Sequence, residues 1–137
     1  MCCEAWQEPT RKAVSTVTVR FTIDLAPNSN WGMNKIYAGT HWNERKQQAQ
    51  QVHLLVRAAI RKQNRNVRKF REPVSICIWY NSRLDIDNHG YIAKLIIDGM
   101  KGVLIEDDDR RYVKELYQGF YGGDKRKIVV EVSEYGK

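Results

Sequence analysis

The apolar residues of this chain follow two different spacings, and the change from one to the other recurs along the sequence. From Val17 to Leu25 every second residue is apolar, which predicts a strand over 13–25 with one buried face. A helical spacing connects the apolar residues of the segments 43–66 and 88–100. Apolar runs within 72–80, 112–120 and 127–134 are typical of further strands. The chain must therefore bury strands and helices together.

This order of segments predicts an α+β fold, in which a mixed sheet packs against helices in the order strand, helix, strand, helix, strand, strand. A length of 137 residues suits a single domain spanning residues 1–137. We expect a long loop between the first strand and the first helix, and we expect Asn43 and Asn88 to cap the two helices. The last two strands are expected to form a hairpin across the turn 122–123, which consists of two glycines.

The sequence shows no sign of a membrane or secreted protein. No apolar run is long enough to span a bilayer, and the N-terminus lacks the basic and apolar segments of a secretion signal. We therefore expect a cytoplasmic protein without a membrane partner. Residues 1–12 have no apolar periodicity and are expected to form a flexible tail.

The chain carries an excess of positive charge, with a formal net charge of +7 and a pI of about 9.4. The segment Arg61–Arg71 contains six basic residues and no acid. Such a run is typical either of a solvated helix end or of a surface that binds phosphates, and the overall charge favours a nucleic acid as partner. The candidate DNA-binding residues are Arg45, Lys46, Arg57, Arg61, Arg65, Arg68, Lys125, Arg126 and Lys127.

Acidic residues nevertheless gather in two places, after the strand 72–80 and after the helix 88–100. Asp85 and Asp87 are two residues apart, so in an extended chain their carboxylates project from one face. The block Glu106–Asp109 can return a third carboxylate to the same place. Carboxylate oxygens are ligands that Mg²⁺ and Mn²⁺ prefer, so the pattern predicts a metal site.

Each of these features also has a purely structural interpretation. A D-x-D-N sequence can end a strand and cap a helix, and the later acids can form a solvated turn. Lys94 lies four residues before Asp98, where it can contact a phosphate or form a surface ion pair, and the spacing alone favours the ion pair. His41 and His89 are expected to make hydrogen bonds within loops rather than to take part in catalysis.

The segment from Asp85 to Asp109 resembles the RusA-like Holliday junction resolvases, which are small, dimeric, metal-dependent endonucleases common in prophages. The motifs that carry the resemblance are the D-x-D-N, the lysine four residues before an aspartate, the glycine turn and the E-D-D sequence. The first strand, the Asn-rich loop, the basic helix and the closing strands follow the order of that family. The resemblance covers most of the chain, and its central segment is the specific part.

The resemblance implies roles for several side chains. It places the family's D-x-D carboxylates on Asp85 and Asp87, and its later catalytic acid on Asp108, with Asp107 as the adjacent candidate. The family's catalytic lysine corresponds to Lys94, although this lysine lies further from the D-x-D motif than in the founding member. The implied metal ligands are Asp85, Asp87, Asp108 and Asp107, with Mg²⁺ as the cofactor and Mn²⁺ as a substitute.

Together these features predict a Mg²⁺-dependent endodeoxyribonuclease that acts as a homodimer and resolves four-way DNA junctions by paired nicks in recombination or repair. The alternative is a basic nucleic-acid-binding module without catalytic activity, whose acids only shape a turn. A D-x-D sugar-nucleotide transferase has less support, because the sequence contains no glycine-rich phosphate-binding loop.

Overall fold

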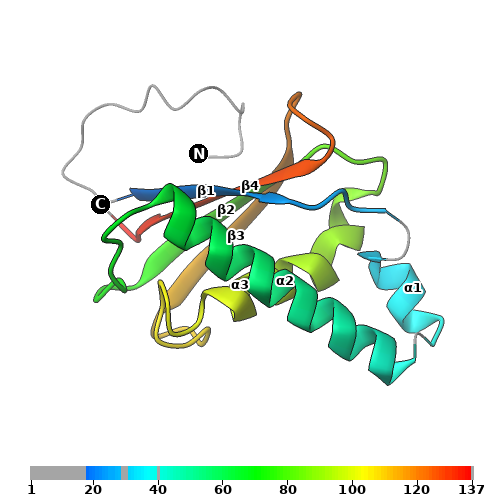
Figure 1. The fold of residues 1–137 in the computed structure, drawn as a ribbon, viewed down its shortest axis with the longest axis horizontal. Helices are drawn as coiled ribbons and strands as arrows, with labels where there is room; N and C mark the ends of the chain where they lie inside the picture. The colour runs from blue at the N-terminus through cyan, green and yellow to red at the C-terminus, as the bar shows by residue number, and fades with distance from the viewer. Residues whose placement is uncertain (1–17, 29–30, 40, 137) are drawn as a thin grey trace.

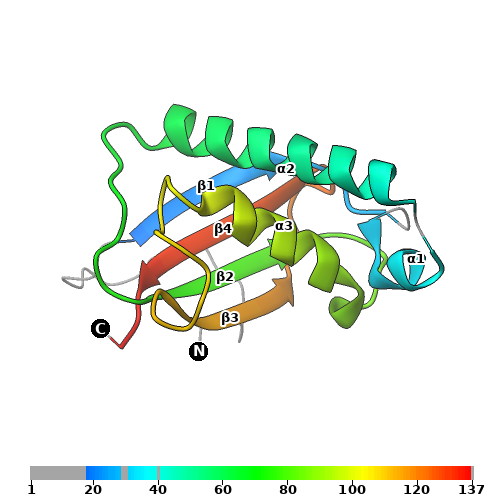
Figure 2. The same ribbon diagram turned by 90° about the horizontal axis from the view of Figure 1, so that it is seen from below.

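The computed structural model describes residues 18–28, 31–39 and 41–136. They form a four-stranded mixed sheet with helices packed on one face (Figures 1 and 2). The strands are β1 (Thr18–Asp24), β2 (Val74–Tyr80), β3 (Val113–Phe120) and β4 (Lys127–Glu134). The helices are α1 (Met33–Tyr37), α2 (Trp42–Gln63), the short 3₁₀ helix η2 (Ile86–His89) and α3 (Gly90–Met100). The predicted α+β fold and the order of its main elements are confirmed.

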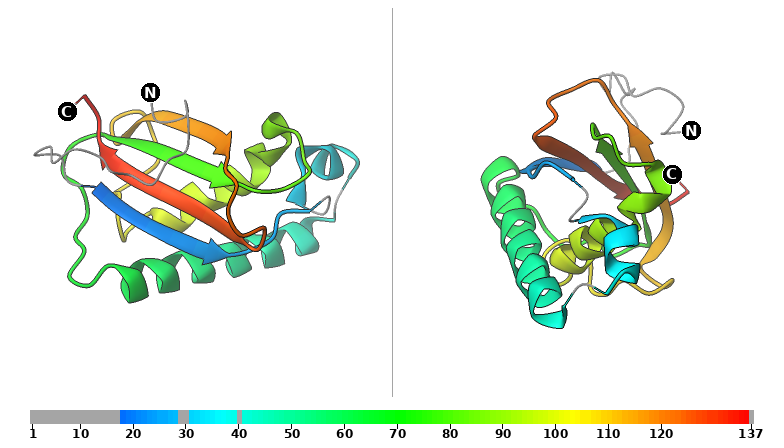
Figure 3. Two further views of the ribbon diagram at one scale, coloured as in Figure 1. Left: turned by 90° about the horizontal axis from the view of Figure 1, so that it is seen from above. Right: turned by 90° about the vertical axis from the view of Figure 1, so that its right-hand side faces the viewer.

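The strands lie in the order β1-β4-β2-β3 across the sheet (Figure 3). β4 pairs antiparallel with both β1 and β2, whereas β3 pairs parallel with β2. The expected hairpin between the last two strands is therefore wrong, because β2 separates them. Residues 128–132 of β4 are all buried, as a strand at the centre of a sheet requires, while β3 is half-exposed at the edge.

The apolar alternation of the first strand is confirmed over the described residues. Val19, Phe21 and Ile23 are buried, and the residues between them are exposed or partly exposed. The segment 13–17, which was expected to begin this strand, and the expected tail 1–12 both lie outside the described residues.

α2 and α3 cover the sheet with the apolar stripes that the sequence predicts. α2 buries Val52, Val56, Ala59 and Ile60, and α3 buries Ile92, Leu95, Ile96 and Met100. Gly99 lies where the two helices touch: a Cβ atom built there would lie 3.1 Å from the Cβ of Val56 and 3.3 Å from the Cα of His53. The absence of a side chain at Gly99 thus lets α3 approach α2 closely. No helix of the described residues is long and apolar enough to cross a membrane.

The two expected helix caps are wrong. His41 caps α2, and its Nδ1 accepts a hydrogen bond from the backbone N–H of Asn43 at 3.1 Å. Asn88 belongs to η2, which runs directly into α3, so it does not cap that helix. Its side chain accepts a hydrogen bond from the backbone N–H of Asn34 at 2.9 Å. This contact holds α1 against η2. The expected long loop is also interrupted, since it contains α1.

Candidate active site

The first two candidate acids lie where the chain leaves the carboxyl end of β2. Asp85 has an extended backbone and immediately precedes η2, and Asp87 is in the first turn of η2. Both side chains are exposed. Their carboxylates are therefore accessible to a ligand from solvent.

His89 holds this segment in place. Its ring is fully buried and stacks on Tyr80 with a centroid distance of 4.0 Å. The Nδ1 atom lies 3.3 Å from the carbonyl oxygen of Ile86 and donates to it, which leaves Nε2 to accept from the hydroxyl of Ser82 at 2.7 Å. Burial lowers the pKa of His89 by more than its backbone hydrogen bonds raise it, so the neutral ring is favoured. The expectation that His89 makes hydrogen bonds within its loop is confirmed.

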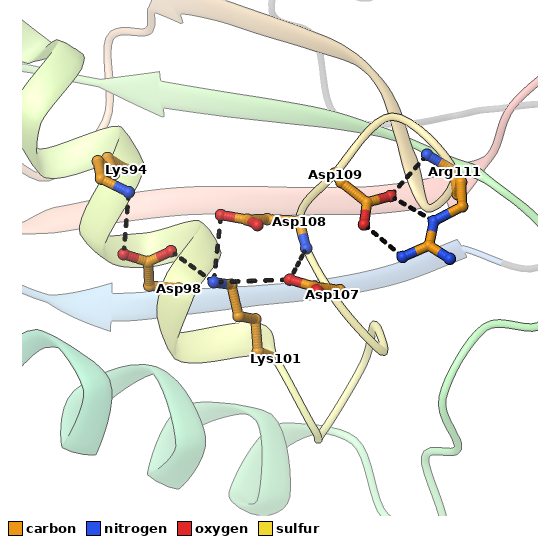
Figure 4. Close-up of polar contacts among 7 residues, drawn as sticks. All are labelled: Lys94, Asp98, Lys101, Asp107, Asp108, Asp109 and Arg111. Atoms are coloured by element: carbon orange, nitrogen blue, oxygen red, sulfur yellow. Dashed lines mark hydrogen bonds and ion pairs between the residues drawn. The ribbon is translucent and has the colours of Figure 1, made fainter.

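The second group of acids lies on the turn 106–109, between α3 and β3. Asp109 is held by Arg111, whose Nε and Nη2 atoms lie 3.1 and 2.8 Å from the two carboxylate oxygens (Figure 4). The hydrogen bonds from Arg111 lower the pKa of Asp109. Asp107 accepts a hydrogen bond from the backbone N–H of Asp108 at 2.8 Å. The carboxylate of Asp109 is thus paired with Arg111, whereas the side chains of Asp107 and Asp108 extend toward α3.

Lys101, at the end of α3, lies among three carboxylates (Figure 4). Its Nζ atom is 3.3 Å from an oxygen of Asp108, 3.4 Å from one of Asp98 and 3.7 Å from one of Asp107. Desolvation lowers the pKa of Lys101, but the hydrogen bond to Asp108 and the charge of Asp98 outweigh it, so the pKa lies above its usual value. The second oxygen of Asp98 is 3.4 Å from Lys94 Nζ, which confirms the ion pair favoured by the spacing.

Lys94 and Asp108 also line a common cavity of about 210 Å³ between α3 and β3. The remaining lining residues are Gly90, Ala93, Ile97, Val113, Leu116 and Gln118. Gly90 is the first residue of α3, so the cavity extends from the start of this helix to the acidic turn, and neither Asp85 nor Asp87 lines it. The side chain of Lys94 therefore forms an ion pair with Asp98 and also lines this cavity.

The two groups of acids approach α3 from its opposite ends. α3 has 11 residues and is therefore about 16 Å long, with Asp87 before its first turn and Lys101 at its last. Asp107 and Asp108 are brought together with Asp98 around the Lys101 amine rather than with Asp85. Among the described residues, no three acidic, histidine or cysteine side chains are arranged to hold one metal ion. The donor chemistry of these carboxylates fits a hard divalent cation, but a lysine amine lies at the centre of the second group.

The family described as Endodeoxyribonuclease RusA matches residues 8–133 of this 137-residue chain. The chain belongs to the RusA family. Its resemblance to the RusA-like Holliday junction resolvases is thereby confirmed, and with it the assignment to the endodeoxyribonucleases. The comparison with curated proteins found no match.

The predicted DNA-binding residues of this RusA-family chain lie on several surfaces. Arg65 and Arg68 are exposed on the loop after α2, where they line an open cavity of about 530 Å³. Arg57 differs from the rest, because its Nε donates to the carbonyl oxygen of Gly99 at 3.3 Å and so connects α2 to α3. Lys127 is partly buried and pairs with Asp24 at 2.5 Å. The remaining candidates are exposed, namely Arg45, Lys46, Arg61, Lys125 and Arg126.

Sequence reasoning missed Lys101, the residue that makes the most ion pairs in this region. A signal for it was present, since Lys101 follows Asp98 by three residues and a helix brings such residues together. Its contacts with Asp107 and Asp108 had no comparable signal, because they depend on how the turn after α3 folds back.

Proposed function

We propose that this chain is a Mg²⁺-dependent endodeoxyribonuclease that acts in the cytoplasm as a two-fold dimer and cuts four-way DNA junctions by paired nicks in recombination or repair. The observation that carries the proposal is that Asp108 and Lys94 line one cavity, in a RusA-family chain whose D-x-D segment lies just before α3, the helix that forms one wall of this cavity. An acid and a lysine at the same opening are suited to a metal-dependent reaction at a phosphate.

The metal ligands in this proposal are Asp85, Asp87 and Asp108, with Asp107 as the neighbouring candidate. Asp109 is not among the proposed ligands, and its carboxylate is proposed to stay paired with Arg111, which contacts both of its oxygens. An ion held by these carboxylates would supply an activated water and neutralise charge on the reacting phosphate. Mn²⁺ is expected to substitute for Mg²⁺, since both prefer oxygen ligands.

Lys94 is proposed to contact the scissile phosphate. Its side chain is 68% exposed and lies on the wall of the cavity, so its amine can reach a phosphate without leaving the helix surface. Asp98 lies 3.4 Å from this amine and would hold it in position. Lys94 would thus offset the negative charge that increases on the phosphate oxygens during the reaction.

The exposed basic residues are proposed to bind the phosphates of the junction arms. Contacts of this kind determine where the DNA lies and carry little sequence information. The dimer is supported by two large apolar side chains on the edge strand β3, Leu116 and Phe120, which are 40% and 48% exposed. Sedimentation of the purified chain tests the dimer, and a monomer at concentrations where cleavage occurs would contradict it.

A synthetic four-way junction with labelled strands tests the catalytic proposal. We expect the wild-type chain to nick opposite strands in the presence of Mg²⁺ and to lose this activity when the ion is chelated. Asp108→Asn and Asp87→Asn are expected to lower the cleavage rate by roughly 100-fold or more, because each removes a negatively charged metal ligand.

Asp109→Asn is the matched control, since it alters the adjacent aspartate but not a proposed ligand. We expect it to retain cleavage within about threefold of the wild type, because an exposed ion pair contributes little. Full cleavage by Asp108→Asn would refute the assignment of this residue. Junction binding that falls with salt but is never followed by a nick would instead support the non-catalytic binding module.

A further inference from the structure

We propose that Tyr37 and Trp42 form an aromatic platform on which the protein stacks bases that become unpaired at the branch point of a DNA junction. The inference rests on the branched DNA substrate of the proposed function. It names the part of that substrate which the protein holds beside the D-x-D segment, and it gives a role to two residues that the cleavage reaction does not use.

Both aromatic residues are left in solvent at the same end of the molecule. Tyr37, the last residue of α1, is 78% exposed, and Trp42, the first residue of α2, is 59% exposed. α1 and the start of α2 lie at the end toward which β2 points, and the D-x-D segment follows β2 (Figure 2). Trp31, by contrast, is buried in the core just before α1. Large apolar side chains that gather on a surface in this way mark a site of interaction.

Hydrogen bonds connect the two helices that carry the platform to the D-x-D segment. The side chain of Asn88 accepts from the backbone N–H of Asn34 at 2.9 Å, which joins η2 to α1. The hydroxyl of Tyr91, in the first turn of α3, donates to the side chain of Gln48 at 3.0 Å, which joins α3 to α2. A Cβ atom built at Gly32 would lie 2.8 Å from the Nδ2 atom of Asn88, so the chain before α1 passes close to η2. The platform is therefore fixed relative to the D-x-D segment.

The surroundings of the platform are basic. The segment 31–48 contains three basic residues, Lys35, Arg45 and Lys46, and one acid, Glu44. The Nζ atom of Lys46 lies 5.9 Å from the centroid of the Trp42 ring, in a cation–π contact. Lysine is depleted at protein–protein interfaces, whereas proteins that bind single-stranded nucleic acid combine basic side chains with aromatic rings. The composition of this surface thus favours DNA over a second protomer.

The Trp42 ring has the shape and surroundings that base stacking needs. The ring of His41 lies beside it, nearly parallel, with a centroid distance of 6.3 Å and an interplanar angle of 21°. Every base has a flat aromatic face, so stacking on such a ring does not depend on the DNA sequence. Bases at a branch point have an interrupted stack and leave the duplex more readily than bases within an arm. The platform therefore favours branched DNA over a continuous duplex.

The experiment measures how tightly the full chain binds three labelled DNAs in the absence of divalent metal: a four-way junction, the same junction with nucleotides that lack a base at the branch point, and a duplex. We expect Trp42→Ala to weaken binding of the intact junction roughly 10-fold, because a stacked base is lost, and to change duplex binding by no more than ~2-fold. The abasic junction should bind the wild type roughly 10-fold more weakly than the intact one, but Trp42→Ala should bind both within ~2-fold, since ring and base act through one contact. The same pattern is expected of Tyr37→Ala.

Tyr135→Ala is the matched control. Tyr135 is 46% exposed and follows β4, whose last residue pairs with the first residue of β2, so it lies at the opposite end of the sheet from the D-x-D segment. We expect this variant to bind each DNA within ~2-fold of the wild type. Trp42→Phe keeps a ring and should recover most of the affinity, whereas Trp42→Leu keeps only apolar volume and should bind as weakly as Trp42→Ala. Lys46→Ala should reduce the slope of log affinity against log salt by about 1, a slope that Trp42→Ala should leave unchanged.

Junction affinities of Trp42→Ala and Tyr37→Ala equal to that of the wild type would overturn the platform and leave the nuclease intact. The same holds if Trp42→Ala still distinguishes the intact from the abasic junction as the wild type does, because the ring would then contact something other than the base. A dimeric wild type and a monomeric Trp42→Ala in sedimentation would show that the ring contacts the second protomer, which also overturns the platform. A wild type that binds the intact junction more tightly than the abasic one but never nicks it with Mg²⁺ would refute the nuclease and support the platform. Equal binding of all three DNAs by the wild type would refute the platform and the preference for junctions together.

Discussion

Gly99 offers a direct test of the packing that places α3, because this glycine lies against α2. In Gly99→Ala the new Cβ would lie 3.1 Å from the Cβ of Val56 and 3.3 Å from the Cα of His53. Carbon atoms in favourable contact are about 3.5–4.0 Å apart, so the helices would have to separate by roughly 0.5 Å. Overpacking of this kind costs about 1–3 kcal/mol. The higher helix propensity of alanine returns at most about 1 kcal/mol, so we expect a net loss of up to about 2 kcal/mol.

Urea denaturation followed by circular dichroism measures this loss as a change in the free energy of unfolding. Gly122→Ala is the control, because a Cβ at Gly122 meets nothing within 4 Å, and its stability should change by no more than about 0.5 kcal/mol. Asp98 and Lys101 flank the contact, so Gly99→Ala should also cleave junctions more slowly. A Gly99→Ala protein as stable as the wild type would show that the helices tolerate the extra atom, and the packing argument would fail.

Two further predictions concern pH and salt. Burial lowers the pKa of His53, so the native state binds a proton less readily than the unfolded chain. The free energy of unfolding should therefore be unaffected by this group above about pH 6.5 and should decrease as the pH falls below that value. Urea denaturation at roughly pH 5.5 and 7 should show a smaller fall for His53→Gln than for the wild type, and equal falls would contradict this assignment. Replacement of both Arg65 and Arg68 by alanine should weaken junction binding and reduce the slope of log affinity against log salt by about 2, whereas an unchanged slope would mean that neither residue binds a phosphate.

The sequence by itself determined which residues are buried and which chemistry is available. The alternation of Val19, Phe21 and Ile23 and the helical stripe that contains Ile96 led to the correct buried faces, because these spacings depend only on the geometry of a single strand or helix. The D-x-D-N sequence and the later acids likewise indicated the RusA family before any contact was known. The ion pair of Lys94 with Asp98 was predictable for the same reason, since both residues belong to one helix.

Only the tertiary structure decided which segments are neighbours. β4 lies between β1 and β2 rather than beside β3, and this pairing depends on segments more than 40 residues apart. The partners of the acids were decided in the same way: Lys101 reaches Asp107 and Asp108 because the turn after α3 folds back onto the helix end. Local spacing specifies the buried face of each helix and strand. Which strands pair with one another, and which basic side chain pairs with a group of acids, depends on distances that arise only when the elements pack together.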